Sequence, residues 1–122
     1  MTSALLILIV DERHDEAFGC EQLREAGYCV VHARAAAAAH SLVEQDEPDL
    51  IVAVDRAGRE FVGSLENKRS LLDCPLIMIG EGDSRQGSRF ATMFLRKPVS
   101  AARLLLEIRN LGLAPVQHPE TD

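Results

Sequence analysis

Short apolar runs alternate with longer mixed segments along most of the chain. Each run stays apolar over consecutive positions instead of alternating with polar residues, which is typical of strands covered on both faces in a parallel sheet. The pattern therefore predicts five short, buried strands. They are ALLILIV (4–10), YCVVHA (28–33), LIVAV (50–54), LIMI (76–79) and TMFL (92–95).

The segments between these runs place apolar residues along one side of a helix. Glycine or proline marks the ends of three of them, and Ser100 can cap the start of the last. The stretch GEGDSRQGSRFA (80–91) holds three glycines and several polar residues, so it predicts at most a short or irregular helix. We expect full helices over 14–26, 35–47, 59–72 and 101–111.

Strand and helix therefore alternate five times along the chain. Because parallel strands are joined by crossover connections of one hand, this order predicts an α/β fold with a doubly wound, five-stranded parallel sheet and helices on both faces. We expect a single domain over residues 1–112. The segment LAPVQHPETD (113–122), with two prolines and no apolar pattern, indicates a linker or disordered C-terminal tail.

Composition and charge narrow the classes of function. The chain has 13 Lys and Arg against 19 Asp and Glu, a net charge of −6 with scattered basic residues, so we expect no direct binding of nucleic acid. The longest apolar run is too short to cross a bilayer and lacks the flanks of a signal peptide, which predicts a cytoplasmic protein with no membrane contact. The three cysteines have no CxxC spacing and should be buried thiols. The sequence has no GxGxxG or P-loop motif that would favour a nucleotide-binding enzyme.

Charged residues follow three of the predicted strands. Asp11 and Glu12 come after the first strand, Asp55 after the third and Lys97 after the fifth. Open α/β sheets bind ligands beyond the carboxyl ends of their strands, where we expect these side chains to converge. Carboxylates suit a hard cation such as Mg²⁺, and Asp55 can act as the nucleophile that accepts a phosphoryl group whose charge the ammonium neutralises.

These strand ends resemble those of response-regulator receiver domains, the CheY-like fold, over residues 5–111. The matching segments are LIVDE (8–12), PDLIVAVD (48–55), CPLIMIG (74–80) and FLRKPVS (94–100). The resemblance implies the strand order 2-1-3-4-5 and a Mg²⁺ site formed by Asp11, Glu12 and Asp55. It also implies that a histidine kinase or phosphotransfer protein phosphorylates Asp55 and that Lys97 pairs with the phosphoryl group.

At other positions this sequence either matches the receiver pattern or departs from it. Phe94 stands at the switch aromatic, and a cis bond is implied between Lys97 and its proline. A gapless alignment places Val54 at the acceptor position, and because side chains alternate along a strand, this slip would turn Asp55 away unless a bulge or a changed strand entry restores it. Gly80 stands at the switch position of a Ser or Thr. The loops after Asp55 and after Gly80 are also shorter than usual.

The sequence therefore predicts a receiver-type signalling domain of a bacterial two-component phosphorelay, not an enzyme. The departures indicate the atypical, or pseudo-receiver, class, with phosphorylation of Asp55 and Mg²⁺ binding weakened or absent. The alternative is a phosphorylation-independent interaction or dimerisation module, whose last helix and fifth strand bind a partner protein, an output domain or a second copy. Asp55 would then be a turn residue, and Lys97 would pair with Asp11 or Asp55 to hold the pocket together.

Overall fold

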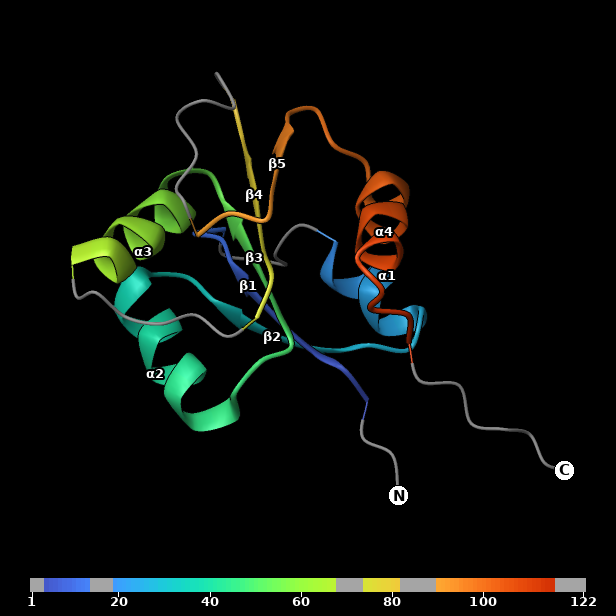
Figure 1. Ribbon diagram of the computed structural model, residues 1–122, viewed down its shortest axis with the longest axis horizontal. Helices are drawn as coiled ribbons and strands as arrows, with labels where there is room; N and C mark the ends of the chain where they lie inside the picture. The colour runs from blue at the N-terminus through green and yellow to red at the C-terminus, as the bar shows by residue number, and fades with distance from the viewer. Residues whose placement is uncertain (1–3, 14–18, 68–73, 82–89, 116–122) are drawn as a thin grey trace, which may run out of the picture.

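A computed structural model describes residues 4–13, 19–67, 74–81 and 90–115 of this protein. They form a five-stranded, all-parallel sheet in the order β2-β1-β3-β4-β5 (Figure 1). The predicted fold class and strand order are confirmed. The strands are β1 (Leu6–Val10), β2 (Cys29–Ala33), β3 (Leu50–Val54), β4 (Leu76–Gly80) and β5 (Met93–Arg96).

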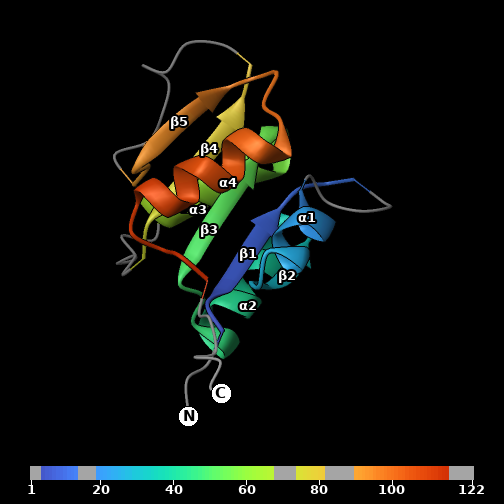
Figure 2. The ribbon, with the colours of Figure 1, turned by 90° about the vertical axis from the view of Figure 1, so that its right-hand side faces the viewer.

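Helices in the described part of the chain cover both faces of this sheet. α1 (Cys20–Glu25) and α4 (Ala101–Asn110) lie together on one face, in front of the strands in Figure 2. α2 (Ala36–Asp46) and α3 (Asp55–Asn67) lie on the opposite face. The sheet is therefore the central layer of three.

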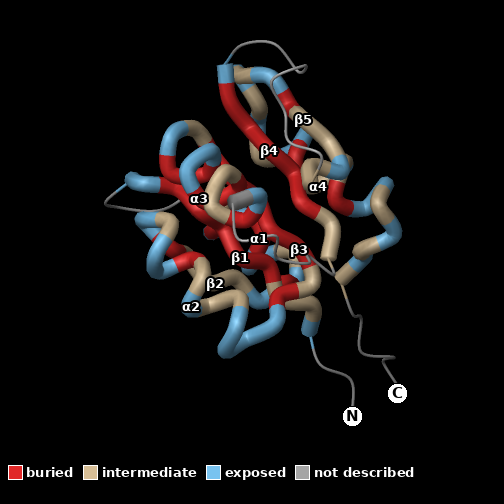
Figure 3. Tube along the Cα trace, turned by 60° about the vertical axis from the view of Figure 1, so that its left-hand side comes forward, coloured by how far each residue is buried: buried red, intermediate tan, exposed pale blue. Residues whose placement is uncertain are grey.

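Each central strand contributes side chains to two hydrophobic cores, one on each face. Along β1, Ile7 and Ile9 pack toward α1 and α4, whereas Leu8 and Val10 pack toward α2 and α3. All four are at most 1% exposed, and burying an aliphatic side chain of this size contributes about 1.5–3 kcal/mol. Figure 3 shows the central strands β1, β3 and β4 as buried. A strand that is buried on both faces needs apolar residues at every position, which explains the continuous apolar runs in the sequence.

α1, α2 and α4 end within one residue of their predicted ends, and α3 begins earlier than predicted. Gly27 and Gly112 take left-handed conformations shortly after α1 and α4, as predicted for residues that end a helix. Ser100 caps α4, because its Oγ accepts a hydrogen bond of 3.0 Å from the backbone N–H of Arg103. α3 begins at Asp55 instead of residue 59, directly after β3. The predicted helical residues 14–18 and 68–72, and residues 82–89 of the predicted irregular segment, lie outside the described residues.

The first residues of the predicted tail lie against the domain. Leu113 packs against the core beside α1 and α4, and its carbonyl accepts a hydrogen bond of 2.6 Å from the Tyr28 hydroxyl. Residues 116–122 are outside the described part of the chain. A domain boundary after Gly112 and a linker beyond it therefore stay predictions.

Two findings bear on the predicted class of protein. The expected burial of the cysteines is confirmed for Cys20, while Cys74 is only half-buried. It is wrong for Cys29, which is exposed because β2 is an edge strand. Within the described ranges, every helix is too short or too polar to cross a membrane.

Candidate functional site

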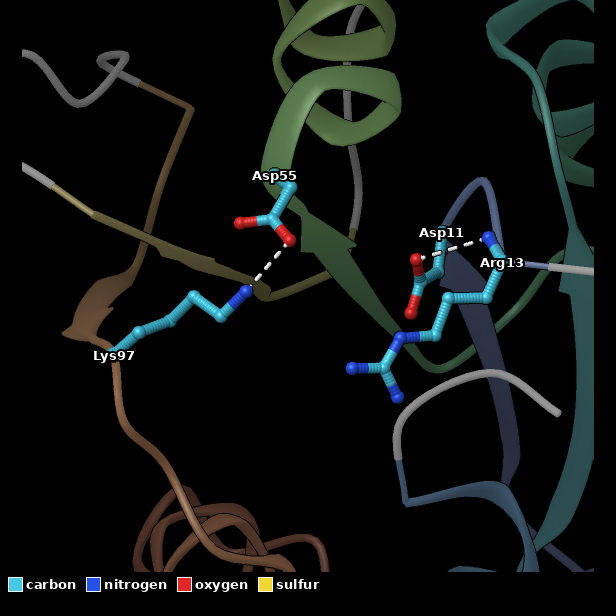
Figure 4. A network of polar contacts seen from close by, with 4 residues as sticks. All are labelled: Asp11, Arg13, Asp55 and Lys97. Atoms are coloured by element: carbon cyan, nitrogen blue, oxygen red, sulfur yellow. Dashed lines mark hydrogen bonds and ion pairs between the residues drawn. The ribbon is translucent and has the colours of Figure 1, made fainter.

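The predicted site residues converge only in part at the carboxyl edge of the sheet. Asp11 and Asp55 follow the neighbouring strands β1 and β3, and Lys97 follows β5. In Figure 4 the side chains of Asp55 and Lys97 point toward each other, while Asp11 lies to one side, next to Arg13. The Lys97–Pro98 peptide bond is cis, as the resemblance implies.

Asp55 and Lys97 form an ion pair across this edge. Lys97 Nζ donates a hydrogen bond of 2.8 Å to Asp55 Oδ2. The side chains are 33% exposed for Lys97 and 37% exposed for Asp55, so solvent screens the pair and its contribution to stability is at most about 1 kcal/mol. Asp55 Oδ1 makes no hydrogen bond with the described residues. The pair therefore leaves one carboxylate oxygen open to another molecule.

Asp55 reaches Lys97 because its backbone has already left the strand. It is the first residue of α3 and has a φ of 53°, in the left-handed region that Asp and Asn tolerate better than most residues. Side chains alternate between faces only within a strand, and β3 ends at Val54. The one-residue slip in the alignment therefore does not turn Asp55 away from the site.

Gly58 makes the direct junction between β3 and α3 possible. A Cβ at this position would lie 2.4 Å from the carbonyl carbon of Ala53, closer than side chains ever approach backbone. The first turn of α3 thus packs on the end of β3 with no residue between the two elements. The predicted shortening of this loop is confirmed, whereas the part played by Gly58 was not predicted.

Asp11 is buried and held by local contacts. The residue is 2% exposed, and its Oδ1 accepts a hydrogen bond of 3.3 Å from the backbone N–H of Arg13. Its own N–H donates to the Ala33 carbonyl at 3.0 Å, and its carbonyl accepts a hydrogen bond of 2.6 Å from His32 Nε2. These contacts fix Asp11 between the ends of β1 and β2.

The carboxylates predicted to bind Mg²⁺ do not form a cluster. Glu12 is exposed, and in the part of the chain that the structure describes, no three His, Cys, Asp or Glu side chains are placed to hold a metal ion. Mg²⁺ requires nearly octahedral oxygen coordination and often keeps several of its waters. The described arrangement therefore does not fit the ion unless Glu12 turns inward.

Gly80 lies beside Asp55 at the end of β4, where the switch position was predicted. A Cβ built on Gly80 would be 3.9 Å from both Asp55 Oδ1 and Arg59 Nη1. The position thus has room for a side chain but supplies no hydroxyl. Phe94, on β5, is half-buried and packs against the core on the side of α2 and α3; its role as a switch stays a prediction.

Arg59 is a site residue that sequence reasoning missed. It follows Asp55 by four positions, a spacing that places two side chains on the same face of a helix. That spacing carries meaning only if both residues belong to one helix, and the prediction began the helix at residue 59. The only signal in the sequence was the shortness of the predicted loop between LIVAV and the helical stripe.

Two open depressions at this edge share Glu81. The first, of about 500 Å³, is lined by Asp55, Arg56, Arg59 and Glu81. The second, of about 520 Å³, is lined by Glu81, Arg96, Lys97 and Pro98. Four of these seven residues are basic and two are acidic. Basic residues therefore outnumber acidic ones among the described residues that line the two depressions, in a chain whose net charge is −6.

Comparison with known proteins finds relatives by structure and not by sequence. No protein-family model matches the chain, and no curated protein matches it. Among solved structures, the chemotaxis protein CheY4 of Vibrio cholerae has a TM-score of 0.72 at 22% identity, over 89% of this chain and 99% of that one. A response regulator receiver modulated diguanylate cyclase from Pelobacter carbinolicus has a TM-score of 0.68 at 24% identity, over 87% of this chain and 90% of that one.

A third similar structure is a larger protein. NtrX from Brucella abortus has a TM-score of 0.69 at 22% identity over 92% of this chain, and the chain spans only 27% of that protein's length. Likeness at this level of identity concerns the fold. The chain therefore has the fold of response-regulator receiver domains.

Proposed function

We propose that this protein is a receiver-type signalling domain of a bacterial two-component phosphorelay and that Asp55 is its phosphoacceptor. The observation that carries the proposal is the 2.8 Å contact between Lys97 Nζ and Asp55 Oδ2. The pair lies beyond the carboxyl ends of the strands, where open α/β sheets bind their ligands. Its partial exposure leaves room for a phosphodonor protein to approach.

In the proposed reaction the Asp55 carboxylate is the nucleophile. Oδ1, which Lys97 does not engage, attacks the phosphorus of a phosphohistidine on a kinase or phosphotransfer protein. A P–O bond to Asp55 forms while the P–N bond breaks, and the departing imidazole takes a proton from solvent. The Lys97 ammonium offsets the negative charge that the phosphoryl group brings to this edge.

Three features support a weakened version of this reaction. Gly80 provides no hydroxyl for a phosphoryl oxygen, the β3–α3 junction has no loop that could rearrange, and Glu12 is exposed instead of facing the other carboxylates. We therefore propose slow phosphorylation that depends on Mg²⁺ weakly or not at all.

The same features favour a second candidate function, a phosphorylation-independent interaction or dimerisation module. Leu106 on α4 is 55% exposed, and among the described residues it is the one large hydrophobic side chain with such exposure. The face formed by α4 and β5 would then bind an output domain, another partner protein or a second copy. In this function the Asp55–Lys97 pair would only hold the edge together.

Acetyl phosphate and beryllofluoride, each with and without Mg²⁺, separate the two functions. We expect mass spectrometry to find one added phosphoryl group on the wild-type protein and none on Asp55→Asn. Beryllofluoride should shift the amide resonances around Asp55 and Lys97 in the wild type alone. Asn is the matched control because it preserves the size of the side chain and tolerates the left-handed backbone.

A folded wild-type protein that gives no adduct would remove Asp55 as the acceptor and leave the interaction module. Sedimentation of the wild type against Leu106→Asp would then test that function, since a charge on α4 should dissociate a dimer formed through this face. Equal sedimentation of two monomers would exclude the dimer.

A further inference from the structure

We propose that Arg59 is an oxyanion-binding residue that contacts the phosphoryl group at Asp55, in the space that Gly80 leaves open. The inference rests on the proposed function for its ligand, and it adds a residue that the receiver resemblance does not supply. The class of ligand is a tetrahedral oxyanion, here a phosphoryl group bound covalently to Asp55.

The first step is the geometry around Gly80. A Cβ at this position would meet Asp55 Oδ1 and Arg59 Nη1 at the same distance, 3.9 Å. Both atoms thus lie in van der Waals range of the point that a Cβ on Gly80 would occupy. Oδ1 is the oxygen that Lys97 leaves open. A phosphoryl group on Oδ1 therefore enters a space that the Arg59 guanidinium borders.

The second step is that this guanidinium is available. Arg59 is exposed, and its side chain makes no hydrogen bond or ion pair with any residue that the structure describes. Its neighbour Arg56, in contrast, approaches Glu60 at 3.8 Å. Guanidinium presents a planar set of N–H donors that matches two oxygens of a phosphoryl group. Arg59 can therefore take up phosphoryl oxygens without giving up another contact.

The third step is that the junction between β3 and α3 fixes Arg59 relative to Asp55. Both residues belong to α3, four positions apart, and both line the same depression. The close approach of Gly58 to Ala53 holds the first turn of that helix on the end of the sheet. The missing loop is thus what brings Arg59 to the site, since a loop after Asp55 would move it away.

The charges facing Arg59 define the conditions under which an anion binds. Asp55 and Glu81 line the same depression, and both repel an anion. Phosphorylation places the oxyanion on Asp55 itself, so the covalent bond overcomes this repulsion. Without a covalent bond, Asp55→Asn removes one opposing charge and should allow inorganic phosphate to bind more tightly than it binds to the wild type.

The covalent arm of the test compares the beryllofluoride adducts of the wild type, Arg59→Gln and Arg59→Lys by NMR titration. We expect Arg59→Gln to weaken the adduct about threefold to tenfold, the range for a charged hydrogen bond at a partly exposed site. Arg59→Lys retains the charge and should lose less. The control is Arg24→Gln, which removes one positive charge from α1, where Arg24 bonds the Val30 carbonyl of β2 at 3.3 Å; its adduct should equal that of the wild type.

The noncovalent arm titrates inorganic phosphate into Asp55→Asn with and without Arg59→Gln. Adduct formation with equal affinity in wild type and Arg59→Gln would overturn the role of Arg59 while leaving the proposed function intact. No adduct in the wild type, together with phosphate binding to Asp55→Asn that Arg59→Gln abolishes, would overturn the proposed function while leaving the anion site. If Arg59→Gln changes neither titration, the inference is wrong.

Discussion

Asp55 combines a partly exposed carboxylate with a left-handed backbone. A φ of 53° costs most L residues about 1–2 kcal/mol, and Asp and Asn are among the few exceptions because their short polar side chains bond locally. The backbone alone thus favours Asp or Asn at position 55. The chemistry of the site adds the requirement for a carboxylate, which pairs with Lys97.

Two substitutions of Asp55 separate backbone strain from loss of the ion pair. Asp55→Asn and Asp55→Ala both remove the charge that Lys97 contacts, but only Ala is strained in the left-handed conformation. We expect Asp55→Ala to have a free energy of unfolding about 1 kcal/mol below that of Asp55→Asn, measured by urea denaturation. Equal stability of the two variants would show that position 55 relaxes to another conformation.

The junction of β3 and α3 has no residue between the strand and the helix. Its shortness follows from two residues, Asp55 with positive φ and Gly58 with no side chain against Ala53. Together they turn the chain from strand to helix without a loop. The same turn sets the position of Arg59, so the architecture of this junction places Arg59 in the depression that Asp55 lines.

Two glycines of α3 provide a matched pair to test this packing. Gly58→Ala should lower the free energy of unfolding by about 1–3 kcal/mol or more, because its Cβ would overlap the backbone of Ala53. Gly63→Ala meets nothing within 4 Å and should raise the free energy of unfolding by up to about 1 kcal/mol through helix propensity. Thermal unfolding by circular dichroism measures both, and a stable Gly58→Ala would contradict the close approach.

The sheet could be predicted from the sequence, but the direct junction between β3 and α3 could not. Continuous apolar runs such as LIVAV (50–54) must be covered on both faces, which leads directly to a parallel sheet between helices. The segment after it, DRAG (55–58), has the residues of a turn, and a turn was the natural interpretation. Whether Gly58 lies in a turn or packs against the strand depends on its distance from Ala53 in the folded protein. The local sequence pattern carries no information on that distance.

The candidate site, too, could be predicted from the sequence only in part. Asp55 and Lys97 follow strands that topology brings to one edge, so their convergence follows from strand order, whereas the choice of Asp55 over Asp11 as the partner of Lys97 does not. Glu12 depends on where a side chain turns after the strand has ended, and the spacing of Arg59 from Asp55 has meaning only once α3 is known to begin at Asp55. Their placement, one exposed and the other beside Gly80, was accordingly beyond what the spacing of residues could show.

At the scale of the whole molecule, a hydrogen bond connects two segments that are distant in the sequence, away from the site of Asp55 and Lys97. Tyr28 precedes β2 and is buried, and its hydroxyl donates to the carbonyl of Leu113, which follows α4. A bond of this kind contributes about 1 kcal/mol. It joins residues 85 positions apart, so it links the first half of the domain to its last helix.

The pKa of Tyr28 depends on whether its hydroxyl stays buried at this hydrogen bond. Burial raises the pKa of Tyr28 above its usual 10.0, and the nearby Arg109 lowers it in part. The folded protein therefore holds this proton more tightly than the unfolded chain, and the resulting stability is complete below pH 10.0 and is lost as the pH rises through the folded pKa. We expect the wild type to be about 1 kcal/mol more stable than Tyr28→Phe at neutral pH, with a difference that shrinks in alkali.

The same residue can be titrated directly. Tyr28 is the one tyrosine of the chain, which has no tryptophan, so the ultraviolet absorbance of tyrosinate follows a single group. Ionisation in the folded protein at a higher pH than in urea-unfolded protein would confirm that the hydroxyl is buried against Leu113. Ionisation at the same pH in both states would contradict a raised pKa of Tyr28, and would mean either that Arg109 offsets the effect of burial in full or that the hydroxyl is exposed in solution.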